Sequence, residues 1–359
     1  MKALIAMSGG VDSSVAALLT KEQGYDCLGC TMKLWDAEQE AGGNALPRPK
    51  SCCSLDDTED ARSVAYKLGM PFYAFNYKDE FMEQVICPFA ADYEQGRTPN
   101  PCIECNRFLK FGKLLRRAEE LGCGKVVTGH YARIERDEDG CYVLKKGLDP
   151  SKDQSYVLHC LTQEQLAQIL FPLGEMTKGE TRAIAEQNGF LNANKPDSQD
   201  ICFVPDGDYA KVVERYGKGG GTQPGAFIDV DGKPVGTHRG IIHYTVGQRK
   251  GLGNTWGRPV FVVAIDPAAN TVTLGDREDL FRREVRVTDF NWIAGEAPAA
   301  PIRCTAKLRY RQAEQPAMAN TAEDGRVTLV FDEPQRAPTP GQYAVLYDGD
   351  VVLGGGRIE

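Results

Sequence analysis

A short apolar run near the start of the chain leads into a glycine-rich turn and then into a helix-like stretch. Residues 3–7 are strand-like, residues 8–13 read SGGVDS, and residues 13–23 have apolar positions at helical spacing. Glycines let a backbone approach an anion closely, and the following helix directs its N–H groups and positive dipole end at the same place. The hydroxyl groups of Ser8 and Ser13 add donors. The segment predicts a phosphate-binding loop, with an ordinary strand-to-helix turn as the simpler alternative.

The loop differs from the two commonest nucleotide signatures. It lacks the Gly-Lys-Ser/Thr ending of a P-loop and the Gly-x-Gly-x-x-Gly spacing of a dinucleotide site. It resembles instead the loop of ATP pyrophosphatases, which holds the pyrophosphate of ATP while a substrate oxygen is adenylated. That resemblance implies that Asp12 helps to place Mg²⁺ near the phosphates.

The first half of the chain alternates between strand and helix patterns. Further strands are predicted at 27–34, 71–77 and 125–128, and further helices at 57–68 and 107–121. This alternation predicts a parallel sheet with helices on its faces.

The pattern changes near residue 205. A glycine-rich segment at 217–225 precedes a region of short β-rich runs, and no long helical pattern appears after about residue 215. The runs lie at 260–265, 271–274, 302–310, 326–331 and 343–347. Such runs are typical of a β-barrel or a sandwich. The predicted fold is α/β, with an N-terminal parallel-sheet domain at 1–205, a small β-rich central domain at 206–285 and a C-terminal β-barrel at 286–359.

Composition excludes several classes of protein. The 359 residues suffice for two or three domains, and no run of 18 apolar residues suggests a membrane-spanning helix. The 12 cysteines are too sparse for a disulfide scaffold. Because the chain opens directly on a strand-like run, we expect no targeting segment and a cytoplasmic location. A net charge of −8 excludes an overall basic surface but not a local one.

Two cysteines at C-x-x-C spacing stand out in the segment TPNPCIECN. Cys102 and Cys105 lie just before a predicted helix N-terminus, a position that lowers the pKa of a thiol. Such a pair is a redox pair, a metal site or a coincidence, and a structural zinc site would need a second pair that does not occur downstream. A third candidate, Cys202, lies in the segment DSQDICF. A cysteine beside Ile201 and Phe203 is by itself more often structural.

Eight motifs in a fixed order give the chain a more specific resemblance. They are SGGVDSS, TPNPC..CN, VTGHYAR, SKDQSY, DSQDICF, HYTVGQRKGLG, LRYR and EPQRAPTPGQYAVLYDGD, and together they span essentially the whole chain. The chain resembles the tRNA-specific 2-thiouridylases, a family of tRNA uridine 2-sulfurtransferases. The resemblance implies an ATP-pyrophosphatase (PP-loop) domain, a small central domain and a C-terminal β-barrel.

The resemblance also implies a reaction. Oxygen at C2 of the wobble uridine of tRNA, position 34, is replaced by sulfur in an ATP- and Mg²⁺-dependent step. The C2 carbonyl is unreactive, and adenylation of its oxygen creates a leaving group that a sulfur nucleophile can displace. By resemblance, Cys202 carries the incoming persulfide. Cys105 is its catalytic partner, which assists sulfur release and closes a Cys105–Cys202 disulfide.

Binding residues follow from the same resemblance. Those expected to hold the nucleotide are Ala6, Met7, Ser8, Gly9, Gly10, Val11, Asp12, Ser13, Met32 and Gly129. Those expected to face the target base are Asn100, Pro101 and Cys102. Those expected to contact tRNA elsewhere are His130, Lys152, Asp153, Gln154, Arg309, Tyr310 and Gln342. On the residues alone, His130 is an ordinary imidazole and residues 152–154 are a polar loop.

Cys102 departs from the family pattern, because many members have aspartate at this position. A thiol is a poorer acid or base at neutral pH and a softer ligand. Cys102, Cys105 and Cys202 are therefore candidate metal ligands for a 4Fe–4S cluster whose open iron would deliver sulfide. A metal-free persulfide route and a cluster route both stay open.

Three basic stretches with few or no acids indicate a nucleic-acid surface. They lie at residues 96–117, 237–251 and 302–312. Such stretches fit phosphate binding, although any one of them is also typical of a solvated face. The target base must leave its stack to reach a buried site, and the loop at Asn100 is its expected receiver. We expect a monomer whose partners are tRNAs for Lys, Glu and Gln and a sulfur donor, either a cysteine desulfurase or a relay protein.

Two other functions compete with this interpretation. A different ATP pyrophosphatase, acting on a small carboxylate or amide, would explain the phosphate loop but not Cys105, Cys202 or the basic stretches. A non-catalytic RNA-binding or metal-storing protein would bind tRNA regardless of ATP and of Cys202.

Overall fold

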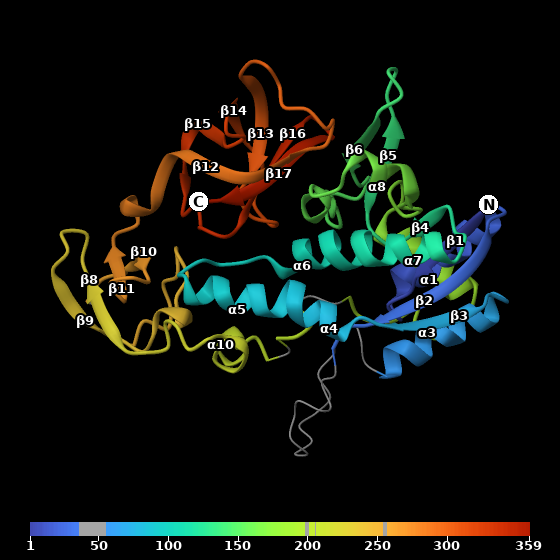
Figure 1. Cartoon of the computed structure of the whole chain (residues 1–359), viewed down its shortest axis with the longest axis horizontal. Coiled ribbons are helices and arrows are strands. Elements are labelled where there is room, and N and C mark those ends of the chain that lie inside the picture. The colour runs from blue at the N-terminus through green and yellow to red at the C-terminus, as the bar shows by residue number, and fades with distance from the viewer. Residues whose placement is uncertain (36–54, 198–200, 205, 254–256) are drawn as a thin grey trace.

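Three β-sheets organise the chain in the computed structural model, which describes residues 1–35, 55–197, 201–204, 206–253 and 257–359. A five-stranded sheet holds the N-terminal region, a four-stranded sheet the central region and an eight-stranded sheet the C-terminal region (Figure 1). Residues 198–200, in the middle of the segment DSQDICF, lie outside the described residues.

The N-terminal sheet is parallel throughout and has the strand order β3-β2-β1-β4-β7. Its strands are β1 (Lys2–Ala6), β2 (Asp26–Lys33), β3 (Phe72–Asn76), β4 (Lys125–Val127) and β7 (Ile169–Leu170). The predicted parallel sheet is confirmed, and its first four strands fall where the apolar runs placed them. The two-residue strand β7 was not predicted.

Alternation along β1 explains why helices cover both faces of this sheet. Ala3 and Ile5 are buried with α1 (Val11–Glu22), α3 (Leu55–Lys67) and α9 (Lys178–Gln187). Leu4 is buried in a second apolar cluster with α5 (Cys87–Glu94) and α7 (Leu114–Glu120). Successive side chains of a strand point to opposite faces, so three buried apolar residues in a row require cover on both. Ligands of such sheets bind at the carboxyl ends of the strands.

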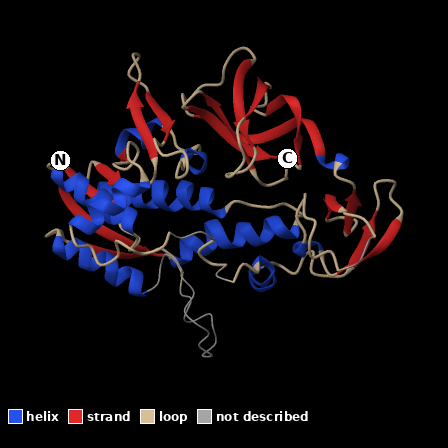
Figure 2. Cartoon of the chain, turned by 180° about the vertical axis from the view of Figure 1, so that it is seen from behind, coloured by secondary structure: helices blue, strands red, loops and turns tan. Residues whose placement is uncertain are grey.

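A continuous helix runs from residue 101 to residue 120. It comprises α6 (Pro101–Glu104), the π-helical part η2 (Cys105–Lys113) and α7. It lies alongside α4 (Lys78–Phe81), η1 (Met82–Ile86) and α5 (Figures 1 and 2). The prediction that this helix starts at residue 107, with both cysteines ahead of it, is wrong. Proline is tolerated at the first helical position, so the helix begins earlier and contains Cys102 and Cys105.

The central sheet is small and antiparallel except for one parallel pair, β11 with β8. Its strands, in the order β10-β11-β8-β9, are β8 (Gly225–Ile228), β9 (Pro234–His238), β10 (Phe261–Asp266) and β11 (Thr271–Gly275). Phe227 and Val262 are fully buried in its core, next to the short helix η4 (Ile241–His243). Helix α10 (Tyr209–Tyr216) attaches this region to α5, since Tyr209 stacks on Tyr93 with ring centroids 4.5 Å apart.

The C-terminal strands close into a barrel. They are β12 (Phe281–Trp292), β13 (Ile302–Lys307), β14 (Gln315–Thr321), β15 (Val327–Arg336), β16 (Tyr343–Asp348) and β17 (Val351–Ile358). Their order is β12-β15-β14-β13-β16-β17, and pairing of β12 with β17, which includes Val287 with Ile358, closes the ring. Full closure removes exposed sheet edges. The predicted C-terminal β-barrel is confirmed.

A hairpin from the N-terminal region extends the barrel sheet. Strands β5 (Ala132–Arg136) and β6 (Tyr142–Lys146) are antiparallel, and β6 pairs with β17 at Lys145 and Val351. Figure 2 shows this hairpin and the barrel on the same side of the long helices. The remaining short helices are η3 (Ser155–Leu158), α8 (Gln163–Gln168) and η5 (Glu278–Leu280). None of the helices in the described ranges is long and apolar enough to cross a membrane.

Candidate active site

The loop between β1 and α1 has a conformation that only glycine permits. Gly9 has a φ of +74°, and a Cβ there would lie 2.2 Å from the carbonyl oxygen of Asp57. Gly10 is the N-cap of α1, whose first N–H groups have no partners within the helix. The Oγ of Ser13 accepts from the N–H of Ser8 at 3.2 Å and donates to the carbonyl of Gly10 at 3.0 Å, so it shapes the loop itself. The loop therefore presents the N-terminus of α1 as an anion site.

Two side chains from a distant segment fix the carbonyl of Gly9. Asn192 is buried, and its Nδ2 donates to this oxygen at 2.9 Å. The Nζ of Lys195 donates to it at 3.3 Å and is itself paired with two carboxylates of α3 at 2.5 and 2.6 Å. In a trans peptide the carbonyl and the next N–H point in opposite directions. The N–H of Gly10 therefore points away from Asn192 and toward the opposite side of the loop.

The other predicted nucleotide residues lie at the same edge of the sheet. Gly129 follows β4, and a Cβ there would lie 2.8 Å from backbone atoms of Asp12 and Ser13. Met32 lies near the carboxyl end of β2, the strand beside β1. The absence of a side chain at Gly129 thus allows the β4 loop to lie against the first turn of α1.

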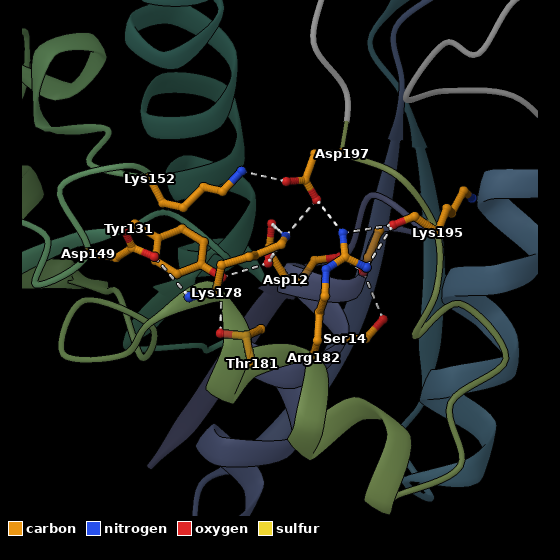
Figure 3. Close-up of polar contacts among 12 residues, drawn as sticks. Asp12, Ser14, Tyr131, Asp149, Lys152, Lys178, Thr181, Arg182, Lys195 and Asp197 are labelled. Carbon is orange, nitrogen blue, oxygen red and sulfur yellow. Dashed lines mark hydrogen bonds and ion pairs between the residues drawn. The ribbon is translucent and has the colours of Figure 1, made fainter.

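Asp12 is the centre of a polar network that the sequence did not predict (Figure 3). Its carboxylate accepts from the Oη of Tyr131 at 2.8 Å and from the Nζ of Lys178 at 2.7 and 2.8 Å. Burial, and next the charge of Asp12, raises the pKa of Tyr131, so the phenol remains a donor. The carboxylate of Asp12 is 31% exposed, which leaves it accessible to a cation from solvent.

Asp197 shares Lys178 with Asp12. Its carboxylate lies 2.7 Å from the Nζ of Lys178, 2.8 Å from that of Lys152 and 3.2 Å from the guanidinium of Arg182 (Figure 3). Burial acts to raise the pKa of this carboxyl, but hydrogen bonds from the two lysines outweigh it and the pKa is lowered. Lys152, predicted to contact tRNA, is thus placed beside the phosphate loop.

The cysteines of the predicted sulfur chemistry lie on two segments. Cys102 is exposed in α6, Cys105 is half-buried at the start of η2, and Cys202 is half-buried. Cys105 and Cys202 pack against the same large apolar cluster. Phe203 is buried with its ring centroid 5.1 Å from that of Phe89, edge to face. Phe203 therefore anchors the backbone next to Cys202.

The three cysteines are not arranged as a site for a single metal ion in the described part of the chain. Within the described ranges, which include Cys102, Cys105 and Cys202, no group of three or more His, Cys, Asp or Glu side chains is arranged to hold a metal ion. A 4Fe–4S cluster is larger than a single ion, and its cysteine ligands bind different irons. The predicted cluster at these cysteines therefore stays a prediction.

The loop before α6 is docked on the barrel. The Nε2 of Gln342 donates to the carbonyls of Thr98 and Pro99 at 2.8 and 3.2 Å. Asn100 follows as the N-cap of α6, and Pro101 is buried. Gln342, predicted to contact tRNA, thus holds the loop that carries the predicted target-base residues.

Arg309 and Tyr310 lie just after β13. Arg309 donates to the carbonyls of Val246 and Ala337 at 3.3 and 3.0 Å, so it ties the barrel to the central region. Tyr310 is 40% exposed, and its Oη donates to the carbonyl of Asp153 at 3.1 Å. Of this predicted pair, Tyr310 offers an aromatic surface to solvent.

His130 is buried between Gly129 and Tyr131 in the segment that follows β4. Its Nδ1 lies 2.7 Å from the Oγ1 of Thr128, and its ring packs on those of Phe111 and Phe171. Burial lowers the pKa of His130 well below its ordinary value of 6.5, so the imidazole is neutral. In this conformation the side chain, predicted to contact tRNA, is enclosed by protein.

Asp153 and Gln154 organise their own loop. Asp153 accepts from the N–H groups of Gly147 and Ser155 at 3.0 and 3.1 Å. The Oε1 of Gln154 accepts from the N–H of Tyr131 at 3.0 Å. These side chains therefore position the residues that follow β4 and β6, next to the network of Asp12.

The side chains that sequence reasoning missed all surround the phosphate loop. They are Tyr131, Lys178, Arg182, Asn192, Lys195 and Asp197. A signal for Lys178 exists in the sequence. Thr177 and Glu180 have capping-box spacing, which places Lys178 at the first position of a helix, where the dipole disfavours a cation. A lysine there suggests an anionic partner elsewhere in the structure.

Family models match almost the entire chain. Residues 1–206 match the tRNA methyl transferase HUP domain, residues 213–276 the tRNA methyl transferase PRC-barrel domain, and residues 282–358 the aminomethyltransferase beta-barrel domain. Among solved structures, a 4-thiouridine synthetase–RNA complex with bound ATP is 19% identical and covers 60% of this chain and 50% of that chain. Its TM-score of 0.36 carries no functional argument.

Full-length relatives are much closer. The tRNA-specific 2-thiouridylase MnmA of Clostridioides difficile (strain 630) is 50% identical over 362 residues, covering 100% of this chain and 98% of the relative. The protein of the same name from Acetivibrio thermocellus is 50% identical over 364 residues, with coverage of 100% and 99%. Identity at this level over whole chains, with three matching domain families in order, shows that this chain belongs to the tRNA-specific 2-thiouridylase family.

Proposed function

We propose that this protein 2-thiolates the wobble uridine of tRNA in an ATP-dependent reaction. The observation that carries the proposal is the phosphate loop, with Gly9 in a left-handed conformation and α1 directly behind it, in a chain whose relatives are 2-thiouridylases over their whole length. ATP supplies the adenylyl group that makes the C2 oxygen a leaving group.

In the adenylation step the residues of the chain bind ATP and orient its phosphates. The pyrophosphate part of ATP lies at the N-terminus of α1, where the N–H of Gly10, oriented through the Gly9 carbonyl by Asn192 and Lys195, contacts it. Asp12 offers a partly exposed carboxylate that fits Mg²⁺. The C2 oxygen attacks the α-phosphorus, and pyrophosphate leaves. Gly129 permits the close approach of the β4 loop to this end of α1.

In the sulfur step Cys202 and Cys105 act in turn. The terminal sulfur of a Cys202 persulfide attacks C2 and displaces AMP, which leaves the sulfur bonded to both C2 and Cys202. The thiolate of Cys105 then attacks the Sγ of Cys202, so that the S–S bond breaks toward the base. The products are 2-thiouridine and a Cys105–Cys202 disulfide, which a cellular thiol reduces before the next turnover.

The proposal includes a tRNA surface and a sulfur donor. The loop around Asn100, held by Gln342, receives the flipped base, and the exposed ring of Tyr310 lies on the barrel side. The substrates are tRNAs for Lys, Glu and Gln, and a cysteine desulfurase or a relay protein loads Cys202. The enzyme acts as a monomer in the cytoplasm.

The test is ATP-dependent thiolation of an unmodified tRNA, detected by retardation in a mercury-containing gel with a persulfide donor supplied. The wild type is expected to give a shifted band that requires ATP. Cys105→Ser and Cys202→Ser are expected to lose thiolation at least 100-fold while keeping ATP binding, because each removes a sulfur that forms or breaks a bond.

Cys141→Ser is the matched control, since Cys141 is exposed in the hairpin turn between β5 and β6. It should leave thiolation unchanged. Full activity of Cys202→Ser would contradict the persulfide step, and AMP formation with a small carboxylate in place of tRNA would indicate a different ATP pyrophosphatase.

A further inference from the structure

Lys178 places its ammonium group at the N-terminal end of α1. Its Nζ lies 2.7 and 2.8 Å from the carboxylate oxygens of Asp12, the second residue of that helix, and 2.7 Å from Asp197 (Figure 3). The side chain is only 11% exposed, and its Nζ lies 6.0 Å from the centre of the Tyr131 ring. A buried lysine is thus held between two carboxylates at the anion site.

The backbone around Lys178 is fixed independently of these carboxylates. Thr177 and Glu180 form a complete capping box, and the N–H of Lys178 donates to Asp149 at 3.0 Å. The residue also sits at the positive end of the α9 dipole, which makes a cation there unfavourable without nearby anions. The cation at this point therefore depends on the anions beside it, Asp12 and Asp197.

We infer that Lys178 binds the pyrophosphate part of ATP and that Asp197 is an internal anion that competes with ATP for it. This inference rests on the proposed function, which places the phosphates at α1 and Mg²⁺ on Asp12. A divalent cation on Asp12 repels the ammonium group, whereas the phosphates attract it. Lys178 then exchanges carboxylate partners for phosphate oxygens across a short distance.

Asp197 has partners that remain when Lys178 leaves. Lys152 is 2.8 Å and Arg182 is 3.2 Å from its carboxylate. Arg182 also donates to the carbonyls of Ala193 and Lys195 at 3.0 and 3.3 Å, which fixes the segment before Asp197. Asp197 therefore stays charged and in place, and it opposes ATP binding through its attraction for Lys178.

Calorimetric titration of ATP and of AMP into the full-length protein tests the inference. Lys178→Ala is expected to weaken ATP binding about tenfold or more, because a charged hydrogen-bond donor to the phosphates is lost, and to affect AMP much less. Lys178→Arg should keep most of the ATP affinity. Asp197→Asn should tighten ATP binding several-fold at low salt, with a smaller gain at high salt.

The double variant Lys178→Ala/Asp197→Asn separates competition from other effects. If Asp197 competes with ATP for Lys178, Asp197→Asn should hardly increase ATP affinity in a protein that lacks Lys178. The matched control is Asp324→Asn, because Asp324 pairs with Arg326 in a barrel turn, and it should leave both titrations unchanged.

Equal losses for ATP and AMP in Lys178→Ala, weaker ATP binding in Asp197→Asn, or a gain that persists without Lys178 would each overturn the inference. If Lys178→Ala fails to fold, Lys178→Arg and Asp197→Asn still decide between the outcomes. Failure of the wild type to bind ATP would instead overturn the proposed function.

Discussion

Burial shifts the pKa values of individual side chains in this protein, and the histidines show this most clearly. The pKa values of His130, His159, His238 and His243 are all lowered, first by burial. His159 lies between the N-terminal region and the barrel, and its Nδ1 donates to the carbonyl of Tyr156 at 2.8 Å. Its Nε2 is buried with no hydrogen-bond partner among the described residues. Protonation there would bury a donor without an acceptor, which explains a pKa of about 4.

This arrangement predicts acid sensitivity from His159. Below pH 6.5 the His159 imidazole binds a proton in the unfolded chain but stays neutral in the folded protein. Stability therefore falls as the pH drops, until the pKa of about 4 in the folded protein is reached. His159 alone should cost about 2 kcal/mol between pH 7 and pH 5. Urea unfolding of the wild type and of His159→Gln at pH 7, 6 and 5 measures this share. Parallel pH dependences of the two proteins would contradict it.

At the scale of elements, the phosphate loop depends on a segment far away in the sequence. Gly9 supplies the left-handed backbone, whereas Asn192 fixes which way its carbonyl points. The sequence reveals the first requirement because glycines and a following helix are a local pattern. It does not reveal the second, since nothing near Asn192 marks a contact with residue 9.

Asn192→Ala should weaken ATP binding about fivefold to tenfold, with little change in the thiolation rate at saturating ATP, because the loop loses a buried hydrogen bond that orients the N–H of Gly10. Steady-state kinetics with varied ATP measures the split between KM and kcat. Asn188→Ala is the control, because the side chain of Asn188 donates to its own helix at the carbonyl of Ile184. An unchanged KM for ATP in Asn192→Ala would rule out this orienting role.

Local patterns also explain which strands were predicted. β1 to β4 are apolar runs, whereas β12 has exposed charged residues at several positions and β17 contains three consecutive glycines. Packing against neighbouring residues, rather than strand propensity, explains these glycines. A Cβ at Gly355, for example, would lie 2.6 Å from the ring of His159. A tertiary contact of that kind has no signature within the strand itself.

At the scale of the whole molecule, acidic residues from other segments offset part of the positive charge of the basic stretches. Lys113 pairs with Glu80 at 2.8 Å, and Arg303 pairs with Asp332, although the sequence around each contains few acids. The fold class was predictable, because strand and helix patterns alternate in the first half of the chain and short β-rich runs follow in the second. The charge of a surface depends on which segments fold together, so it was not.

The contact between the barrel and the loop at residues 98–99 predicts a role for Gln342 across domains. Gln342→Ala should lower thiolation about tenfold and leave ATP binding unchanged, because the two hydrogen bonds that it loses hold the predicted receiver of the base. Gel-shift thiolation and calorimetry on the same samples check both parts. Gln315→Ala, on β14 of the same barrel, should match the wild type. A loss of ATP binding in Gln342→Ala would point to a wider disturbance.

The hairpin of β5 and β6 has a consequence for how the chain is made. Its partner at Val351 is synthesised more than half the chain length after Lys145. During that interval on the ribosome, β6 presents an unpaired edge to every neighbouring chain. Lys146 puts a positive charge at the end of that edge, which disfavours pairing with other chains, whereas the charge of Lys145 is paired with Glu135 of β5 at 2.5 Å. The same lysines later join the finished sheet, with the N–H of Lys146 bound to the carbonyl of Asp350 at 2.9 Å.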